Sequence, residues 1–182
     1  WCWMDPRTLV FVPQAERMPM ATTYRVDIPA GTAAASGATL ADDVTFEFAT
    51  PAPRLVARTP EGDSVRPDSL VVLVFDQSVD ADAVLAATSV KAGRRTVALR
   101  LATAEEIADD PAAASLADSV PEGRVVVLRP VVPFPFDATS SVTLKKGLRS
   151  LEGPRATTSL ITWTFRTPEP FRVQQLRAGW RD

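Results

Sequence analysis

The chain has 182 residues, of which 46% are hydrophobic and 23% charged, and its formal net charge is −2. This composition is typical of a globular protein of one or two domains, and it offers no basic surface for nucleic acid or an anionic membrane. Histidine is absent and cysteine occurs once, which excludes histidine-based acid–base catalysis, His/Cys metal centres and a disulfide within the chain. The longest apolar run, 70–75, is far too short to span a membrane.

The first 50 residues predict a few short strands. Tyr24, Val26 and Ile28 alternate with polar residues, and 44–48 is a second alternating set that contains two phenylalanines. A sheet this small leaves its aromatic face in water unless further strands cover it. We expect those strands to lie before Trp1, so residues 1–52 are interpreted as the C-terminal part of a truncated domain. The chain as a whole is interpreted as a fragment of something longer.

Residues 53–169 predict a complete β-sandwich. Seven strands are expected, at 54–58, 70–75, 89–92, 96–101, 124–129, 140–146 and 160–166, as an Ig-like sandwich requires. The strand at 70–75 is apolar on both faces, so it should be central and covered twice. Asp80 is the expected N-cap of a short helix that runs through Ala87.

A helical insertion is expected at about 101–122. Thr103 and Glu106 have the spacing of a capping box, and Asp110-Pro111 offers a second helix start. Because large apolar residues are few here, we expect the helices to make a small contact that covers one end of the sandwich. A Gly-Ser link in place of 104–119 should then leave the domain folded. Docking of a partner is the alternative interpretation.

The stretch 9–51 recurs at 126–168, offset by 116 or 117 positions. Each copy runs from a strand and a proline to a Thr-led strand, a turn with paired glycines and an aromatic strand. Thr50-Pro51 and Thr167-Pro168 close the copies, and a short proline-stiffened linker follows each. We expect a third unit to begin at 170–182. The fold class predicted is therefore all-β, a tandem array of Ig-like sandwiches whose expected partners are neighbouring domains of the same chain.

Several groups of side chains are candidates for chemistry, and we favour a structural role for each. Asp76, Asp80 and Asp82 offer oxygen ligands for Ca²⁺, but without the glycine turn and distal glutamate of a known loop. We expect caps and loop ends there. Cys2 is a candidate nucleophile, yet no base or cation lies near it in sequence. Tyr24 has the position of the corner tyrosine of Ig-like folds, with Ser140 in its place in the second copy.

Charged clusters complete the candidates. The carboxylates of the insertion are a candidate pair for acid–base work, although a solvated face is the better interpretation; they are Glu105, Glu106, Asp109 and Asp110. Arg94-Arg95 and Lys145-Lys146 are short basic clusters that could contact an acidic partner. We predict no catalytic, cofactor-binding or metal-binding residue, and no enzyme.

Six motifs carry a family resemblance. They are Leu-Val-Phe-x-Pro from Leu9, Thr-Tyr-x-Val from Thr23, Ala-Gly-Thr from Ala30, Ser-Gly-Ala-x-Leu from Ser36, Phe-x-Phe-x-Thr-Pro from Phe46 and Val-Phe-Asp-Gln-x-Val-Asp from Val74. Together with the turn at 147–150 and the exit at 171–173, they resemble the N-terminal Ig-like domains of bacterial alpha-2-macroglobulin-like proteins. The resemblance covers nearly the whole chain.

This resemblance implies a non-catalytic structural module in a protein of the periplasm or cell surface that traps proteases through a bait segment and often a thioester. The target protease would be reached through the full-length parent. Neither reactive element is identifiable here, since the thioester motif pairs Cys-Gly with Glu-Gln and Cys2 is followed by Trp3. The alternative is an Ig-like module of a surface adhesin or S-layer protein. A glycan-binding module should offer an exposed aromatic platform, whereas most of these aromatic residues occupy alternating, inward-facing strand positions.

Overall fold

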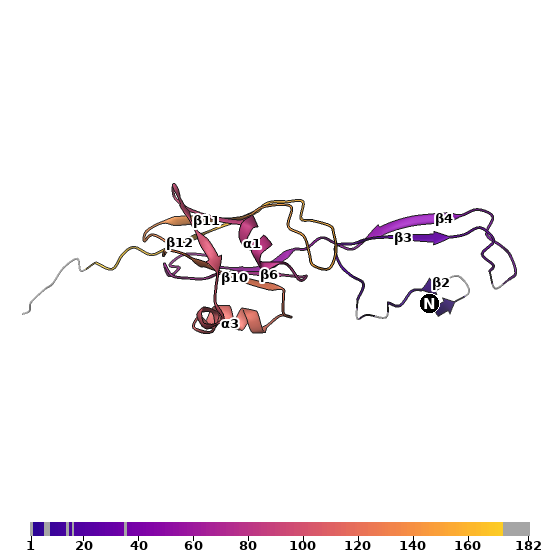
Figure 1. Cartoon of the computed structure of the whole chain (residues 1–182), viewed down its shortest axis with the longest axis horizontal. Coiled ribbons are helices and arrows are strands. Elements are labelled where there is room, and N and C mark those ends of the chain that lie inside the picture. Colours follow the sequence, from indigo (N-terminus) through magenta and orange to yellow (C-terminus); the bar gives the residue numbers. More distant parts are fainter. Residues whose placement is uncertain (1, 6–7, 14, 16, 35, 173–182) are drawn as a thin grey trace, which may run out of the picture.

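The computed structural model describes residues 2–5, 8–13, 15, 17–34 and 36–172. They form two units that follow one another along the long axis of the molecule (Figure 1). The first unit holds β1 (Cys2–Asp5), β2 (Thr8–Val10), β3 (Thr23–Ile28) and β4 (Val44–Ala49), which pair as the hairpins β1–β2 and β3–β4. The third unit expected from about residue 170 falls mostly outside the described residues.

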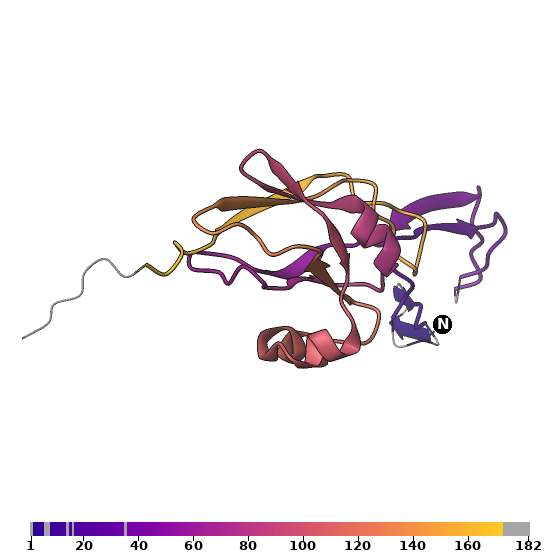
Figure 2. The same cartoon turned by 60° about the vertical axis from the view of Figure 1, so that its left-hand side comes forward.

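The second unit is a two-layered β-sandwich with three short helices. Its elements are β5 (Leu55–Thr59), β6 (Val71–Phe75), α1 (Ala81–Ala87), β7 (Thr88–Ala92), β8 (Arg95–Val97), β9 (Leu99–Leu101), α2 (Ala104–Ala108), α3 (Pro111–Asp118), β10 (Val125–Pro130), β11 (Thr139–Leu144) and β12 (Ile161–Arg166). The antiparallel sheets β5-β6-β10-β9 and β12-β11-β7-β8 face each other (Figure 2). This order is that of the two immunoglobulin sheets with one additional strand, so the all-β sandwich expectation is confirmed.

One expected strand is divided between the two sheets. Val97 in β8 pairs with Val90 of β7, whereas Leu99 in β9 pairs with Pro130 of β10, so the chain changes sheets at Ala98. Residues 55–166, all described, therefore form eight strands rather than the expected seven. Strands that change sheets form the corners of sandwiches. The apolar alternation continues through Ala98, and for this reason the sequence pattern shows no break there.

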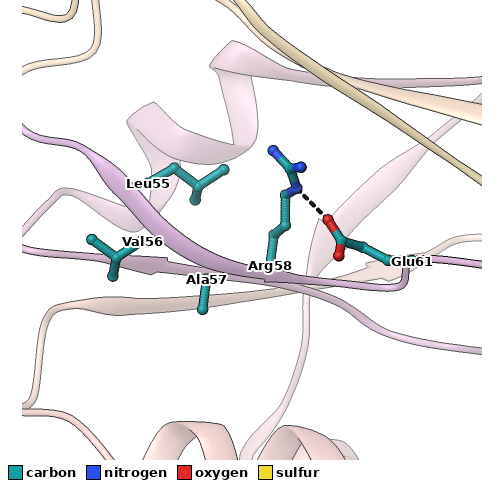
Figure 3. A pocket seen from close by; sticks show the side chains of 5 residues that line it. All are labelled: Leu55, Val56, Ala57, Arg58 and Glu61. Atoms are coloured by element: carbon teal, nitrogen blue, oxygen red, sulfur yellow. Dashed lines mark hydrogen bonds and ion pairs between the residues drawn. The ribbon is translucent and has the colours of Figure 1, made fainter.

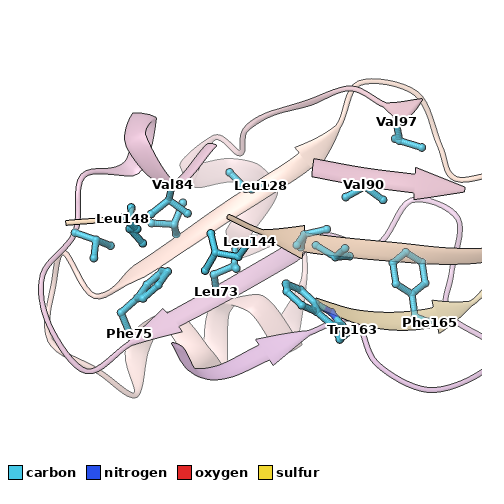
Figure 4. Close-up of a cluster of buried hydrophobic side chains, with 14 of the residues drawn as sticks. Leu73, Phe75, Val84, Val90, Val97, Leu128, Leu144, Leu148, Trp163 and Phe165 are labelled. Atoms are coloured by element: carbon cyan, nitrogen blue, oxygen red, sulfur yellow. The ribbon is translucent and has the colours of Figure 1, made fainter. Parts of the chain in front are cut away.

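The core lies between the two sheets (Figure 4). Its buried side chains include Val71, Leu73, Phe75, Val84, Val90, Leu128, Val142, Leu144, Trp163 and Phe165. Phe134 packs edge-on against Phe165 with ring centroids 5.0 Å apart. The indole N–H of Trp163 donates to the Pro60 carbonyl oxygen at 3.1 Å, which satisfies the polar atom that burial would otherwise leave unpaired.

Strand β6 is buried on both faces, as expected. All five of its residues are buried. Leu70, Val72 and Val74 belong to a second cluster, on the face away from the main core, together with Ala113 of α3 and Val127 of β10. The insertion helices α2 and α3 therefore cover the outer face of this sheet. The expectation that they cover one end of the sandwich is wrong. The helices bury their apolar side chains against the outer face of β6 and β10, which is itself apolar.

The helix starts lie where capping chemistry places them. Asp80 accepts from Ala83 N–H at 2.7 Å at the start of α1. Thr103 and Glu106 form a complete capping box at the start of α2. Asp110 caps α3, with Pro111 in its first turn. Helices this short are unstable alone in water, so their packing on the sandwich maintains them.

The repeat seen in sequence is also a repeat of hydrogen bonding. Corresponding positions pair in the same register: Tyr24↔Phe48 and Val26↔Phe46 in the first copy match Ser140↔Phe165 and Val142↔Trp163 in the second. Gly31 and Gly147 both have positive φ, of 83° and 96°, a conformation that favours glycine. The two copies therefore share one backbone pattern from the Thr-led strand to the closing proline.

The corresponding faces differ in burial. Phe46 and Phe48 are 49% and 41% exposed, whereas Trp163 and Phe165 are 6% and 2% exposed beneath the opposite sheet. Tyr24 stacks on Phe48, with ring centroids 5.3 Å apart. Among the described residues the aromatic face of β3–β4 is thus partly in water, as the sequence predicted.

Candidate functional site: the joint between the two units

The carboxylates considered for calcium or acid–base chemistry have structural partners. Asp76 accepts from the backbone N–H of Arg54 at 2.8 Å, and Asp80 caps α1. Asp82 lies in the first turn of α1, where the helix dipole favours a negative charge. No group of three or more His, Cys, Asp or Glu side chains that could hold a metal occurs among the described residues. Asp76, Asp80 and Asp82 are therefore not brought together as a ligand set.

Glu106 is the most strongly perturbed carboxyl of the insertion. Both of its oxygens accept from the Arg100 guanidinium, at 2.5 and 2.8 Å, and one accepts from the backbone N–H of Thr103 at 3.0 Å. Arg129 lies 3.2 Å away as a second cation. The hydrogen bonds from Arg100, followed by that from Thr103, lower the pKa of Glu106 from 4.5 to about 2. This carboxylate ties α2 to β9 and β10, and its lowered pKa suits an ion pair rather than a general base.

The remaining candidates are dispersed. Glu105 and Asp109 are exposed, while Asp110 caps α3 and pairs with Arg66 at 3.4 Å. The side chain of Cys2 lies outside the described part of the structure. Arg94-Arg95 and Lys145-Lys146 are exposed pairs at strand ends.

Tyr24 does have the corner role expected of it, since its hydroxyl donates to the Pro19 carbonyl oxygen at 2.9 Å. The hydroxyl oxygen of Ser140, its counterpart, is buried and has no hydrogen-bond partner among the described residues.

A shallow hollow runs along β5, at the edge of the sandwich (Figure 3). Leu55, Val56, Ala57, Arg58 and Glu61 line it. The two charged side chains pair with each other at 2.5 Å, and the Arg58 guanidinium lies 5.1 Å from the Trp163 ring centroid. The charged side chains that line the hollow thus contact each other and the Trp163 ring, and these contacts stabilise the edge strand β5. Among the described residues no helix is long and apolar enough to span a membrane.

A network of polar contacts lies where the two units meet. Glu152, in the loop after β11, accepts from the Arg17 guanidinium at 2.6 and 2.8 Å. The same carboxylate accepts from the backbone N–H groups of Met20 and Ser78 at 3.4 and 3.2 Å. Met20 belongs to the first unit and Ser78 to the second, so one carboxylate bridges both. Charge-assisted bonds of this kind are the stronger class of hydrogen bond.

Arg155 makes the second set of contacts across the joint. Its backbone N–H donates to the Ala21 carbonyl oxygen at 2.8 Å, and its guanidinium donates to the Thr50 carbonyl oxygen at 2.6 Å. Gln77, fully buried, donates from its side-chain amide to the Pro51 carbonyl oxygen at 3.0 Å. The loops 76–78 and 150–155 of the second unit therefore bind the end of the first unit through its backbone carbonyl groups.

Gly153 lets the two backbones approach closely. A Cβ atom at this position would lie 2.3 Å from the Thr22 hydroxyl oxygen, and 2.4 and 2.6 Å from the carbonyl oxygens of Met20 and Ala21. No side chain fits into that space without separation of the units. We define the joint by Gln77, Glu152, Gly153 and Arg155 on the second unit and by residues 17–22 and 50–51 on the first.

Sequence reasoning did not single out the joint. Gln77 was only part of a motif, Gly153 was only one of the paired glycines of the repeat, and neither Glu152 nor Arg155 was a candidate. A signal was present in the comparison of the two copies. The loop of the second copy has three charged residues, Arg149, Glu152 and Arg155, where residues 31–39 of the first copy have none. Charges added to an otherwise repeated loop indicate a contact specific to that copy.

No protein-family model matches the chain, and no curated protein matches it. Among solved structures the chain is similar to the surface layer protein SbsC, domains 1–6, with 14% sequence identity and a TM-score of 0.41. The match covers 65% of this chain and 14% of that one. The similarity is too distant to carry an argument about function, and the resemblance to alpha-2-macroglobulin-like proteins rests on the sequence motifs alone.

Proposed function

We propose that this chain is a non-catalytic spacing module, in which successive β-sandwich units of a bacterial envelope protein are held in one arrangement. The observation that carries the proposal is the joint. A flexible linker would leave the units free to reorient, whereas here Glu152, Gly153 and Arg155 bind the first unit directly. Two of the four linker residues, Thr50-Pro51-Ala52-Pro53, are prolines, which restricts the remaining freedom.

The parent protein is proposed to be an alpha-2-macroglobulin-like protease trap of the periplasm or cell surface. The support is the set of motifs, including the Asp76-Gln77 segment, of which Gln77 lies in the joint. In this role the module positions other parts of the parent and carries no bait segment or thioester itself. A Cys-Gly-Glu-Gln segment elsewhere in the parent reading frame would support the trap, and a cell-wall anchor would favour the alternative.

The alternative is an adhesin or S-layer module that binds a polymer. One observation favours it, namely the partly exposed and stacked pair Tyr24 and Phe48, beside the exposed Phe46. Aromatic faces of this kind are common at binding sites. The register of β3–β4 argues against it, because the corresponding face of β11–β12 is a sandwich core.

Incubation of the purified chain with several endopeptidases and a protein substrate tests the proposal. We expect unchanged cleavage rates at micromolar chain, because the reactive elements of the proposed trap lie elsewhere. Stoichiometric inhibition would show that the chain itself acts on proteases, and it would overturn the spacing role. A chain with Phe46→Ser and Phe48→Ser separates non-specific apolar binding from true inhibition.

A further inference from the structure

The two units end in the same backbone arrangement. Ala21 N–H donates to Pro51 O at 2.9 Å, and Asp137 N–H donates to Pro168 O at 2.8 Å. Ala21 and Asp137 are both non-glycine residues with positive φ, of 54° and 49°, which is uncommon enough to mark them as corresponding positions.

The closing threonines also correspond. The Thr50 hydroxyl donates to the Pro19 carbonyl oxygen at 3.0 Å, and the Thr167 hydroxyl donates to the Pro135 carbonyl oxygen at 2.6 Å. Each of these hydroxyl groups also accepts from a backbone N–H at the start of the Thr-led strand. The ends of the two units therefore have one local structure.

Within the described part of the chain, only the end of the first unit is bound by another unit. There the carbonyl oxygens of Ala21 and Thr50 accept from Arg155. Their counterparts, the carbonyl oxygens of Asp137 and Thr167, accept no hydrogen bond from the described part of the chain. The Asp137 carboxylate is engaged separately with Arg166, at 2.6 Å, so it does not block the carbonyl group.

The end of the second unit differs from the end of the first in the side chains that surround it. The segment 131–136, which corresponds to the segment of Arg17, contains no cation. It exposes Val131, Val132 and Phe136 by 58%, 51% and 54% instead, and Phe171 nearby in the chain is 94% exposed. Exposed apolar groups around free acceptors are typical of a contact surface. A unit that docks on this end therefore needs an apolar side chain at the position that Glu152 has in the existing joint.

We propose that the end of the second unit, formed by Asp137, Thr167, Pro168 and Phe136, is a docking surface for the glycine- and arginine-containing loop of a further β-sandwich unit on the same polypeptide. The proposal rests on the spacing function above. This end lies opposite the joint along the long axis (Figure 1), so docking here extends the array in line with the two units already present.

A concatemer tests the proposal, in which residues 1–168 are followed by a second copy of residues 52–168. The new linker, Thr167-Pro168-Ala52-Pro53, then has the length of the natural one. With Cys2→Ser as background, spin labels at Lys91→Cys in both copies of the second unit report the distance across the new joint. We expect a narrow distance distribution that broadens when Arg155→Ala is made in the appended copy. Arg149→Ala, an exposed arginine of the same loop, is the matched control and should change nothing.

Replacement of Glu152 by Leu in the appended copy is expected to narrow the distribution further, because Leu matches the apolar surroundings of Phe136. A broad distribution that is indifferent to Arg155 would overturn the docking proposal. A label pair at Glu47→Cys and Lys91→Cys across the natural joint separates the spacing proposal from the docking proposal. A broad distance distribution there would contradict the spacing function. A narrow distribution there, together with a broad one at the new joint, would contradict the docking proposal alone. Self-association that rises with concentration and is lost in Phe136→Ser would also overturn docking within one chain.

Discussion

Glycine has two different uses at corresponding positions of the two copies. Gly37 has a φ of +83° and no heavy atom within 4 Å of an added Cβ, so its backbone conformation requires glycine. Gly153 does not have a left-handed φ, and the contact distances to Thr22, Met20 and Ala21 require it instead. Alanine at position 153 therefore tests the approach of the units without added backbone strain.

Glu106 gives a prediction for pH. Its pKa is lowered to about 2 by the hydrogen bonds from Arg100 and Thr103, so the ionised carboxylate is favoured in the folded state. The stability that it contributes should be fully present above about pH 4.5 and should be lost as the pH falls towards 2. We expect Glu106→Gln to be less stable than the native chain at pH 6, with a difference that shrinks steadily between pH 4.5 and 2. Urea unfolding at a series of pH values measures this.

Glu105→Gln is the control for this titration, because Glu105 is exposed in the same helix turn and takes no part in the capping box. Its effect on stability at pH 6 should be small. A Glu106→Gln variant whose deficit stays constant down to pH 2 would contradict the assignment of the ion pair.

The insertion shows how an element is misplaced when its burial partner is distant in sequence. The small number of large apolar residues in the insertion predicted a small contact, yet Ile107 and Leu116 pack on a sheet face that also buries Leu70, Val72 and Val74. The doubly apolar strand and the insertion were both recognised, but local patterns do not connect them. The two helices are the second cover that β6 needs.

Replacement of residues 104–119 by a Gly-Ser link should therefore lower the free energy of unfolding by more than the loss of a surface loop would. Partial exposure of the four outer-face side chains, Leu70, Val72, Val74 and Val127, should cost on the order of 5 kcal/mol. That is a large share of a domain stability of about 5–15 kcal/mol. We expect a much lower urea midpoint, and binding of an apolar dye to the uncovered face.

Single substitutions keep this prediction testable if the deletion fails to fold. Leu116→Ala should destabilise the chain by about 1–3 kcal/mol, since the residue is partly buried, whereas Ser115→Ala on the exposed side of α3 should be nearly neutral. Equal stability of all three proteins would mean that the helices do not support the sheet.

The sequence predicted those features that depend on neighbouring residues. Asp80, Thr103 and Asp110 were found as caps because each acts on a backbone N–H two or three residues away. The repeat was found because it preserves the order of strands and turns. The sheet change at Ala98 and the joint were not found, since the guanidinium of Arg155 meets Thr50 across 105 positions. Such contacts depend on how the folded units meet.

At the scale of the whole molecule, the joint makes the two units one elongated body (Figure 1). The first unit contributes backbone carbonyl oxygens and Arg17, and the second contributes a loop shaped around Gly153. Heterologous contacts of this kind, in which one end of a unit binds the opposite end of the next, extend an array without closing it. The proposed spacing function depends on this geometry.

The distance distribution between labels at Glu47→Cys and Lys91→Cys in the Cys2→Ser chain tests the central claim most directly. Both positions are exposed and lie on strands of different units. The joint predicts one narrow distribution, which broadens in Gly153→Ala and in Arg155→Ala but not in the loop control Arg149→Ala. A distribution that is broad in the native chain, or that all three variants leave unchanged, would show that the units move independently and would contradict the account.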